Sequence, residues 1–187
     1  MTNPDLFPLT VKTSKRAKKA LSVDFEIAPE RVEPRAAFTF ASWRLLPPAS
    51  LSPSKRAKLS GFSVGFSTFS GAWEVAHDVN GCRSMRDAEI ARIPRRLVRD
   101  LMRTIADERN RTGDDDLFAK RHPRASYALG AFRDFEAGDR VRVWDASAGE
   151  RGAFASGEVV ETSKCTTTIR FECGLVESYP DALVDLA

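Results

Sequence analysis

The stretch HDVNGCRSMRDAEIA, residues 77–91, carries the residue types that can hold a phosphate group. An alternating apolar run leads into a glycine turn, and Ser84 followed by Asp87 fits the S/T-x-x-D/E capping box that starts a helix. The pattern predicts a strand, a turn and a helix beginning near Ser84, whose free amides would attract an anion. An ordinary structural turn is the alternative. The phosphate-binding candidates are Gly81, Cys82, Arg83, Ser84 and Arg86.

At Val79, Gly81 and Arg83 the same stretch resembles the ParB/sulfiredoxin superfamily, in which a strand ends in a G-x-R-like turn that handles a nucleotide phosphate. Cys82 after Gly81 is similar to the Gly-Cys pair of the sulfiredoxins. Within that superfamily, the size and the basic N-terminal part are similar to those of the Osa-like plasmid fertility-inhibition proteins. The resemblance implies a DNA-directed nuclease and ATPase of a plasmid or phage, with ATP and Mg²⁺ as the implied cofactors.

Carboxylates that could support a metal-assisted phosphodiester reaction flank this turn. They are Glu74, Asp78, Asp87 and Glu89, and each is more typical of an ordinary surface acid. The run from Asp114 to Asp116 could bind a divalent ion, but three successive acids after a helix are more typical of a solvated loop. Neither histidine has a Ser or Cys arrangement that predicts a nucleophile. The sequence therefore assigns no catalytic residue and no metal ligand.

The basic pentapeptide SKRAK occurs twice, at residues 14–18 and 54–58, each time a few residues before a Phe-containing strand. Solvated loops whose lysines discourage sheet-edge pairing would explain both copies. Contact with a phosphate backbone would explain them together with the other basic segments. The nucleic-acid-binding candidates are Lys15, Arg16, Lys55, Arg56, Arg95, Arg99, Arg103, Lys120 and Arg121.

Charge is divided unevenly along the chain, whose net charge is +3. From Asp134 onward there are 11 acids against 5 Lys/Arg, so the positive charge belongs to residues 1–133. A positive domain predicts a polyanionic partner, and a solubilising surface bias is the alternative.

No apolar run approaches the roughly 20 residues of a membrane span, and no signal-peptide centre is found, so we expect a cytoplasmic protein. The three scattered cysteines predict neither a disulfide framework nor a zinc site.

The phosphate and basic candidates must be positioned by a small sheet followed by helices. Residues 21–27 and 36–46 alternate as strands do, and the segments on either side of Ser70-Gly71 predict a hairpin. Pro94 interrupts the helical pattern, so we expect a break just before it.

In the second helix, Leu97, Leu101 and Ile105 recur every four residues and predict the core face. The same periodicity places Arg95, Arg99 and Arg103 on the opposite, solvent-facing side.

From residue 138 onward, short strands alternate with glycine-containing turns and resemble a small SH3-like, Tudor or KOW barrel. The predicted fold class is α+β, with a small mixed sheet and helices in residues 1–133 and a C-terminal SH3-like β-barrel in residues 134–187. Such barrels serve unrelated functions, so this resemblance predicts the architecture and not the function.

The predicted function is that of a nucleic-acid-binding accessory protein of a mobile element. If the protein is an enzyme, we expect an ATP-dependent DNase of ParB/sulfiredoxin type. The alternative is a non-enzymatic adaptor or inhibitor that docks on a protein partner through the barrel. No RRM, zinc-finger or P-loop pattern is present, so base-specific reading is not predicted. DNA and RNA remain equal candidates.

Overall fold

The computed structural model describes residues 6–13, 19–29, 39–67, 70–79, 82–84, 88–145 and 153–187. The chain divides into two compact units, residues 1–101 and residues 102–187. The boundary predicted at residues 133 and 134 falls inside the second unit, where helical segments precede the C-terminal strands. The two units are therefore described one after the other.

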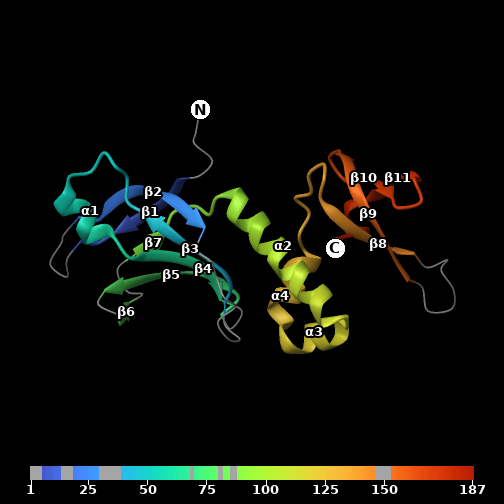
Figure 1. Cartoon of the computed structure of the whole chain (residues 1–187), viewed down its shortest axis with the longest axis horizontal. Helices are drawn as coiled ribbons and strands as arrows, with labels where there is room; N and C mark the ends of the chain where they lie inside the picture. Colours follow the sequence, from blue (N-terminus) through green and yellow to red (C-terminus); the bar gives the residue numbers. More distant parts are fainter. Residues whose placement is uncertain are drawn as a thin grey trace. The chain divides into compact units, whose positions relative to one another are not determined.

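Seven strands make up the sheet of the N-terminal unit, in the order β6-β5-β4-β3-β2-β1-β7. All neighbours are antiparallel, so the mixed sheet that we predicted is wrong. β7 also lies close to β5, and the sheet curls into a nearly closed barrel (Figure 1). The strands are β1 (Leu6–Val11), β2 (Leu21–Pro29), β3 (Thr39–Leu46), β4 (Phe62–Ser67), β5 (Ala72–Val79), β6 (Cys82–Ser84) and β7 (Ala88–Ile90).

The core of this barrel is made by alternate residues of its strands, as a period of two requires. Phe25 of β2 and Phe62 of β4 meet with ring centroids 5.8 Å apart. The predicted hairpin of β4 and β5 is confirmed, with Val64 opposite Val75 and a positive φ of 66° at Gly71 in the turn. The buried side chains include Phe7, Leu9, Val11, Val23, Phe25, Leu45, Phe62 and Val64.

The helix predicted to begin near Ser84 is wrong. Cys82–Ser84 form β6, which pairs with the end of β5, and Ala88–Ile90 form β7, which pairs with β1. A capping box is a local pattern, whereas β5 and β1 offer complete ladders of backbone partners. Pairing with the adjacent strand β5 and with the distant strand β1 satisfies backbone groups of the two segments and overrides the capping box.

The helix α2 (Arg95–Thr112) starts directly after Pro94, as predicted, and the Leu97 amide donates to the Pro94 carbonyl at 3.0 Å. Its core face is also confirmed, because Leu97, Leu101 and Ile105 are at most 1% exposed. The outward position predicted for Arg99 is wrong, since that side chain is only 6% exposed. Met102, three residues further on, is buried as well, so the buried stripe is wider than the row of leucines suggested.

The C-terminal unit carries a five-stranded antiparallel sheet in the order β11-β10-β9-β8-β12, which confirms the predicted C-terminal β-structure. Its apolar core includes Val141, Val143, Val159, Ile169 and Val184. The strands are β8 (Arg140–Asp145), β9 (Ala153–Thr162), β10 (Thr166–Phe171), β11 (Val176–Pro180) and β12 (Val184–Leu186), with a short 3-10 helix, η1 (Asp181–Leu183), before the last strand.

Two short helices of this unit were missed by the sequence patterns, α3 (Asp115–Arg121) and α4 (Pro123–Gly130). The Asp114 carboxylate caps α3 by accepting the Leu117 amide at 2.9 Å, so part of the acidic run has a structural role. Pro123 occupies the first turn of α4, where it is well tolerated. No helix in the described ranges is long and apolar enough to cross a membrane.

Gly61 joins the short helix α1 (Pro53–Leu59) to β4 and is held against β5. Its φ is +87°, and an added Cβ would lie 2.5 Å from the Asp78 carbonyl oxygen. Gly61→Ala should therefore lower the free energy of unfolding by more than the roughly 1–2 kcal/mol of left-handed backbone strain alone. Gly113→Ala is the matched control, because Gly113 has a φ of +68° and open space around its Cβ position. Equal losses in urea unfolding of the two variants would contradict this prediction.

Candidate functional site

Of the residues predicted to hold a phosphate, those that the structure describes do not lie at a helix start. Cys82, Arg83 and Ser84 belong to β6, while Gly81 and Arg86 lie outside the described residues. Without a helix, the dipole that supported an anion site is missing there. The phosphate site remains a prediction that depends on the turn alone.

Those acids near this turn that the structure describes are not gathered into a metal site. Glu74 accepts a hydrogen bond from the Ser70 hydroxyl at 2.7 Å, and Asp78 is exposed at the end of β5. Asp87 lies outside the described residues. Among the residues that the structure describes, no group of three or more His, Cys, Asp or Glu side chains is placed to hold a metal ion.

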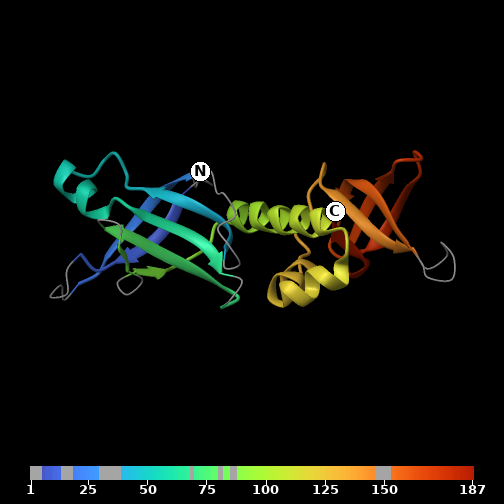
Figure 2. The same cartoon turned by 60° about the horizontal axis from the view of Figure 1, so that its bottom comes forward.

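The N-terminal barrel brings two basic connections to one of its ends. β1 ends at Val11 opposite Leu21, the first residue of β2, and the connection after β3 returns to β4 at Phe62. Because β1, β2 and β3 alternate in direction, the connections 12–20 and 47–61 leave the barrel at the same end. Figures 1 and 2 both show α1, within the second connection, at the end of the N-terminal strands opposite the start of α2.

Five exposed cations occupy the described parts of these two connections, and we call this group the basic end. None of them forms an ion pair with another described residue. In α1 every side chain except Leu59 is exposed, so a single buried residue anchors a helix that is otherwise in solvent. The basic end consists of Lys12, Lys19, Lys55, Arg56 and Lys58.

Lys55 and Arg56, predicted from the second SKRAK copy, lie in a helix where a loop was the alternative. Pro53 at the first helical turn was the pattern that could have revealed this helix. Lys15 and Arg16, from the first copy, lie outside the described residues, although Lys12 and Lys19 flank them.

The remaining basic candidates do not join this group. Arg95 is exposed and Arg99 buried in the N-terminal unit, whereas Arg103, Lys120 and Arg121 belong to the second unit. Arg103 donates to the Asp139 carboxylate at 2.7 Å, and that carboxylate is 1% exposed. Lys120 and Arg121 lie in the last turn of α3, where cations complement the helix dipole.

Arg109 is the charged residue whose role the sequence patterns missed. It follows Ile105 by four residues, so it continues the buried face of α2, and it is 5% exposed. Its guanidinium donates to the Leu186 carbonyl of β12, and its Nε lies 3.9 Å from the Asp115 carboxylate of α3. Arg142 of β8 donates to the other oxygen of Asp115 at 2.5 Å and lies 4.0 Å from Asp185.

Burying Arg109 next to a second arginine costs electrostatic free energy, and the neighbouring acids reduce that cost. Burial, followed by repulsion from Arg142, lowers the pKa of Arg109, while Asp115 and Asp185 act in the opposite direction. Asp115 is therefore the shared counter-ion that makes two neighbouring guanidinium groups compatible. The cluster consists of Arg109, Arg142, Asp115 and Asp185.

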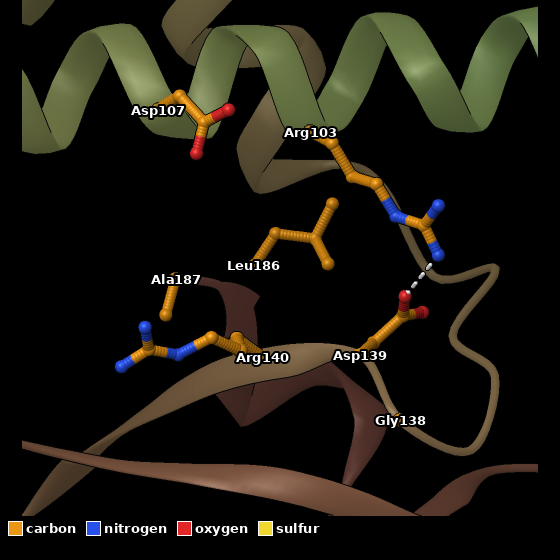
Figure 3. Close-up of a pocket in the computed structure, with 7 residues that line it drawn as sticks. All are labelled: Arg103, Asp107, Gly138, Asp139, Arg140, Leu186 and Ala187. Atoms are coloured by element: carbon orange, nitrogen blue, oxygen red, sulfur yellow. Dashed lines mark hydrogen bonds and ion pairs between the residues drawn. The ribbon is translucent and has the colours of Figure 1, made fainter.

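A small cavity of about 240 Å³ lies in the same unit, between α2 and the strands β8 and β12 (Figure 3). Figure 3 shows Leu186 between the helix and the strand, with charged side chains on both walls. Its charged lining residues are two acids and two arginines, which does not favour a phosphate ligand, and it is smaller than the roughly 300 Å³ of typical small-molecule sites. The lining residues are Arg103, Asp107, Gly138, Asp139, Arg140, Leu186 and Ala187.

Two aromatic side chains lie exposed on the outer face of the C-terminal sheet. Trp144 of β8 and Phe154 of β9 are cross-strand partners with centroids 5.0 Å apart in an edge-to-face arrangement. They are 48% and 41% exposed. The guanidinium carbon of Arg142 lies 3.9 Å from the Phe154 ring centroid. The alternation of GDRVRVWD, which places Trp144 on the polar face, could have revealed this aromatic pair.

Comparisons of the chain with protein-family models, with curated proteins and with solved structures each found no match. The described residues offer three candidate sites besides the small cavity, namely the basic end, the arginine cluster and the aromatic pair. The basic end has cations that pair with no other described residue. The charges of the arginine cluster are engaged with one another, and the aromatic pair exposes flat rings.

Asp115→Asn should destabilise the C-terminal unit, because Arg109 and Arg142 would no longer have a carboxylate between them. We expect a loss of about 1–2 kcal/mol, below the roughly 3–5 kcal/mol of a fully buried pair, since Asp115 is about half exposed. Asp116→Asn removes a neighbouring exposed acid of α3 that has no ion pair among the described residues, and it serves as the control. Equal unfolding midpoints for both variants would show that Asp115 has no special role.

Proposed function

We propose that this protein is a nucleic-acid-binding accessory protein that holds a phosphate backbone at the basic end of its N-terminal barrel. The observation that carries the proposal is the set of five exposed cations without ion-pair partners among the described residues. The charge of the two units supports it. Residues 1–101 contain 17 Lys/Arg against 10 Asp/Glu, whereas residues 102–187 contain 12 against 16.

The chemistry of exposed lysine and arginine favours a polyanion over a small acidic metabolite. Such cations bind phosphates by neutralising charge and releasing counter-ions, which requires no enclosed pocket and reads no base sequence. The basic end supplies this kind of contact on two connections, one of them a helix with three of the cations. DNA and RNA are both suitable, and the proposed location of this activity is the cytoplasm.

Nucleotide-dependent cleavage is the less supported part of the proposal. The ParB/sulfiredoxin resemblance at Val79, Gly81 and Arg83 implies it, with ATP and Mg²⁺ as cofactors, but the strand β6 stands where a helix start was expected. Incubation of the protein and Mg²⁺ with plasmid DNA, with and without ATP, tests this part separately from binding. Intact plasmid under both conditions would count against the nuclease.

A second candidate function is docking on a protein partner through the C-terminal sheet, for which we propose an SH3-like barrel. Four consecutive strands form a meander and the fifth, β12, returns to pair with the first, β8, which supports that topology. Leu175, Val176 and Leu183 are each about half exposed on this unit. Leu175 and Val176 are adjacent in the chain, and neighbouring exposed apolar side chains favour a protein-docking surface.

Replacing Lys55, Arg56 and Lys58 together with glutamine should weaken binding to random-sequence DNA at low salt. Since these side chains are exposed and have no ion-pair partner among the described residues, the stability should change by less than about 0.5 kcal/mol. The slope of log affinity against log salt should become shallower by up to about 0.7–0.9 for each phosphate that the variant no longer neutralises. Fluorescence anisotropy over a salt series measures both effects.

The control removes the same amount of charge from the C-terminal unit. Arg111, Arg133 and Lys164 are exposed there, and their glutamine variant should bind DNA with an affinity within about twofold of the wild type. Equal reductions of affinity in the two triple variants would mean that net charge, and not the basic end, determines binding. A wild type that does not bind DNA at low salt would refute the proposal itself.

A further inference from the structure

The aromatic pair is unusual because two large rings are exposed next to each other on one sheet face. Single exposed apolar residues are ordinary, but contiguous ones more often mark a contact surface. The edge-to-face arrangement of Trp144 and Phe154 holds both rings through mutual contact. A partner would therefore meet rings that are already ordered.

The two rings are not equally available. Arg142 covers the Phe154 ring, and its guanidinium is held in place by Asp115 of α3. Trp144 is the more exposed of the pair, with 48% of its surface open. The flat surface offered to a partner is thus mainly the indole of Trp144.

Cations lie on the same face of the sheet. Residues 140, 142 and 144 alternate to one side of β8, and Arg140 is opposite Glu158, which is in turn opposite Arg170 of β10. Arg140 and Arg170 are exposed, and Arg140 is four residues from Trp144, which is roughly 13 Å along a strand. At that distance the platform depends on its rings and not on these arginines.

We propose that the aromatic pair is a stacking platform for unpaired nucleobases, which makes the substrate single-stranded nucleic acid. This inference rests on the proposed function and specifies its substrate class. Bases in a duplex are stacked on each other and hide their faces, whereas single strands offer them to aromatic side chains. The excess of acids in residues 102–187 disfavours a continuous phosphate backbone across this unit, but it does not oppose a neutral ring.

The test compares a fluorescein-labelled 20-nucleotide single strand, without self-complementarity, with the corresponding duplex, using the full-length protein. Trp144→Ala should weaken binding of the single strand roughly 5- to 150-fold, the range observed when one base-stacking aromatic is removed. Duplex binding should stay within twofold. Trp144→Phe should restore most of the single-strand affinity, and Trp144→Leu, which keeps an apolar cover without a flat ring, should not.

Tyr127→Ala is the matched control, since Tyr127 of α4 is an exposed aromatic residue of the same unit, at 79% exposure. Its single-strand affinity should equal that of the wild type. Urea midpoints of all variants identify any that fail to fold, and if Trp144→Ala does so, the comparison of Trp144→Phe with Trp144→Leu decides the question.

Three results would overturn the platform. If the wild type binds both oligonucleotides and neither Trp144→Ala nor Trp144→Leu weakens single-strand binding, the platform is wrong and the basic end stands. If neither oligonucleotide binds at low salt, the proposed function fails as well. If Trp144→Ala abolishes self-association in sedimentation velocity while single-strand binding is unchanged, the pair is a protein interface.

Discussion

A guanidinium group that is buried must be paired, and in this protein that requirement ties the end of α2 and the helix α3 to the strands β8 and β12. Arg109 is 5% exposed and reaches a carbonyl of β12 and a carboxylate of α3, and the same carboxylate binds Arg142 of β8. Removing a charge from water costs several kcal/mol unless such partners are supplied. The last part of α2, the helix α3 and the strands β8 and β12 are therefore held in one arrangement, which explains why they fall in one unit.

The same constraint divides the arginines by role. Arg103, Arg109 and Arg142 are engaged with Asp139, Asp115 and Asp185, so they stabilise the unit and are poorly available to a polyanion. The cations of the basic end have no such partners among the described residues and lie on connections of the N-terminal barrel. Folding thus leaves the basic end as the group of cations to which we assign nucleic-acid binding. The aromatic pair adds flat rings to a unit whose charges are largely balanced against one another.

Predictions from the sequence succeeded where the pattern that decides the structure lies within a short stretch of the chain. Leu97, Leu101 and Ile105 mark the core face of α2 by their spacing, and the β4–β5 hairpin is marked by alternation around Gly71. They failed where contact with another element decides the outcome. The capping box at Ser84 was overridden by pairing with β5, and the burial of Arg99 depended on how wide the buried face of α2 becomes.

The candidate site, like the fold, was predicted only in part from the sequence. SKRAK at residues 54–58 identified Lys55 and Arg56, which are exposed and lack ion-pair partners among the described residues. Arg103 looked equivalent in the sequence, but its counter-ion Asp139 lies 36 residues away along the chain, so no local pattern could reveal that it was engaged. Trp144 and Phe154 became a pair only through the register of β8 with β9.

The division of roles between the two units is tested most directly by amide hydrogen exchange of the full-length protein with and without a short random-sequence oligonucleotide at low salt. Slower exchange is predicted in peptides covering residues 47–61 and in those ending near Lys12 or beginning near Lys19, with unchanged exchange across residues 102–112. Protection concentrated in residues 102–112, with none in 47–61, would contradict the assignment of binding to the basic end.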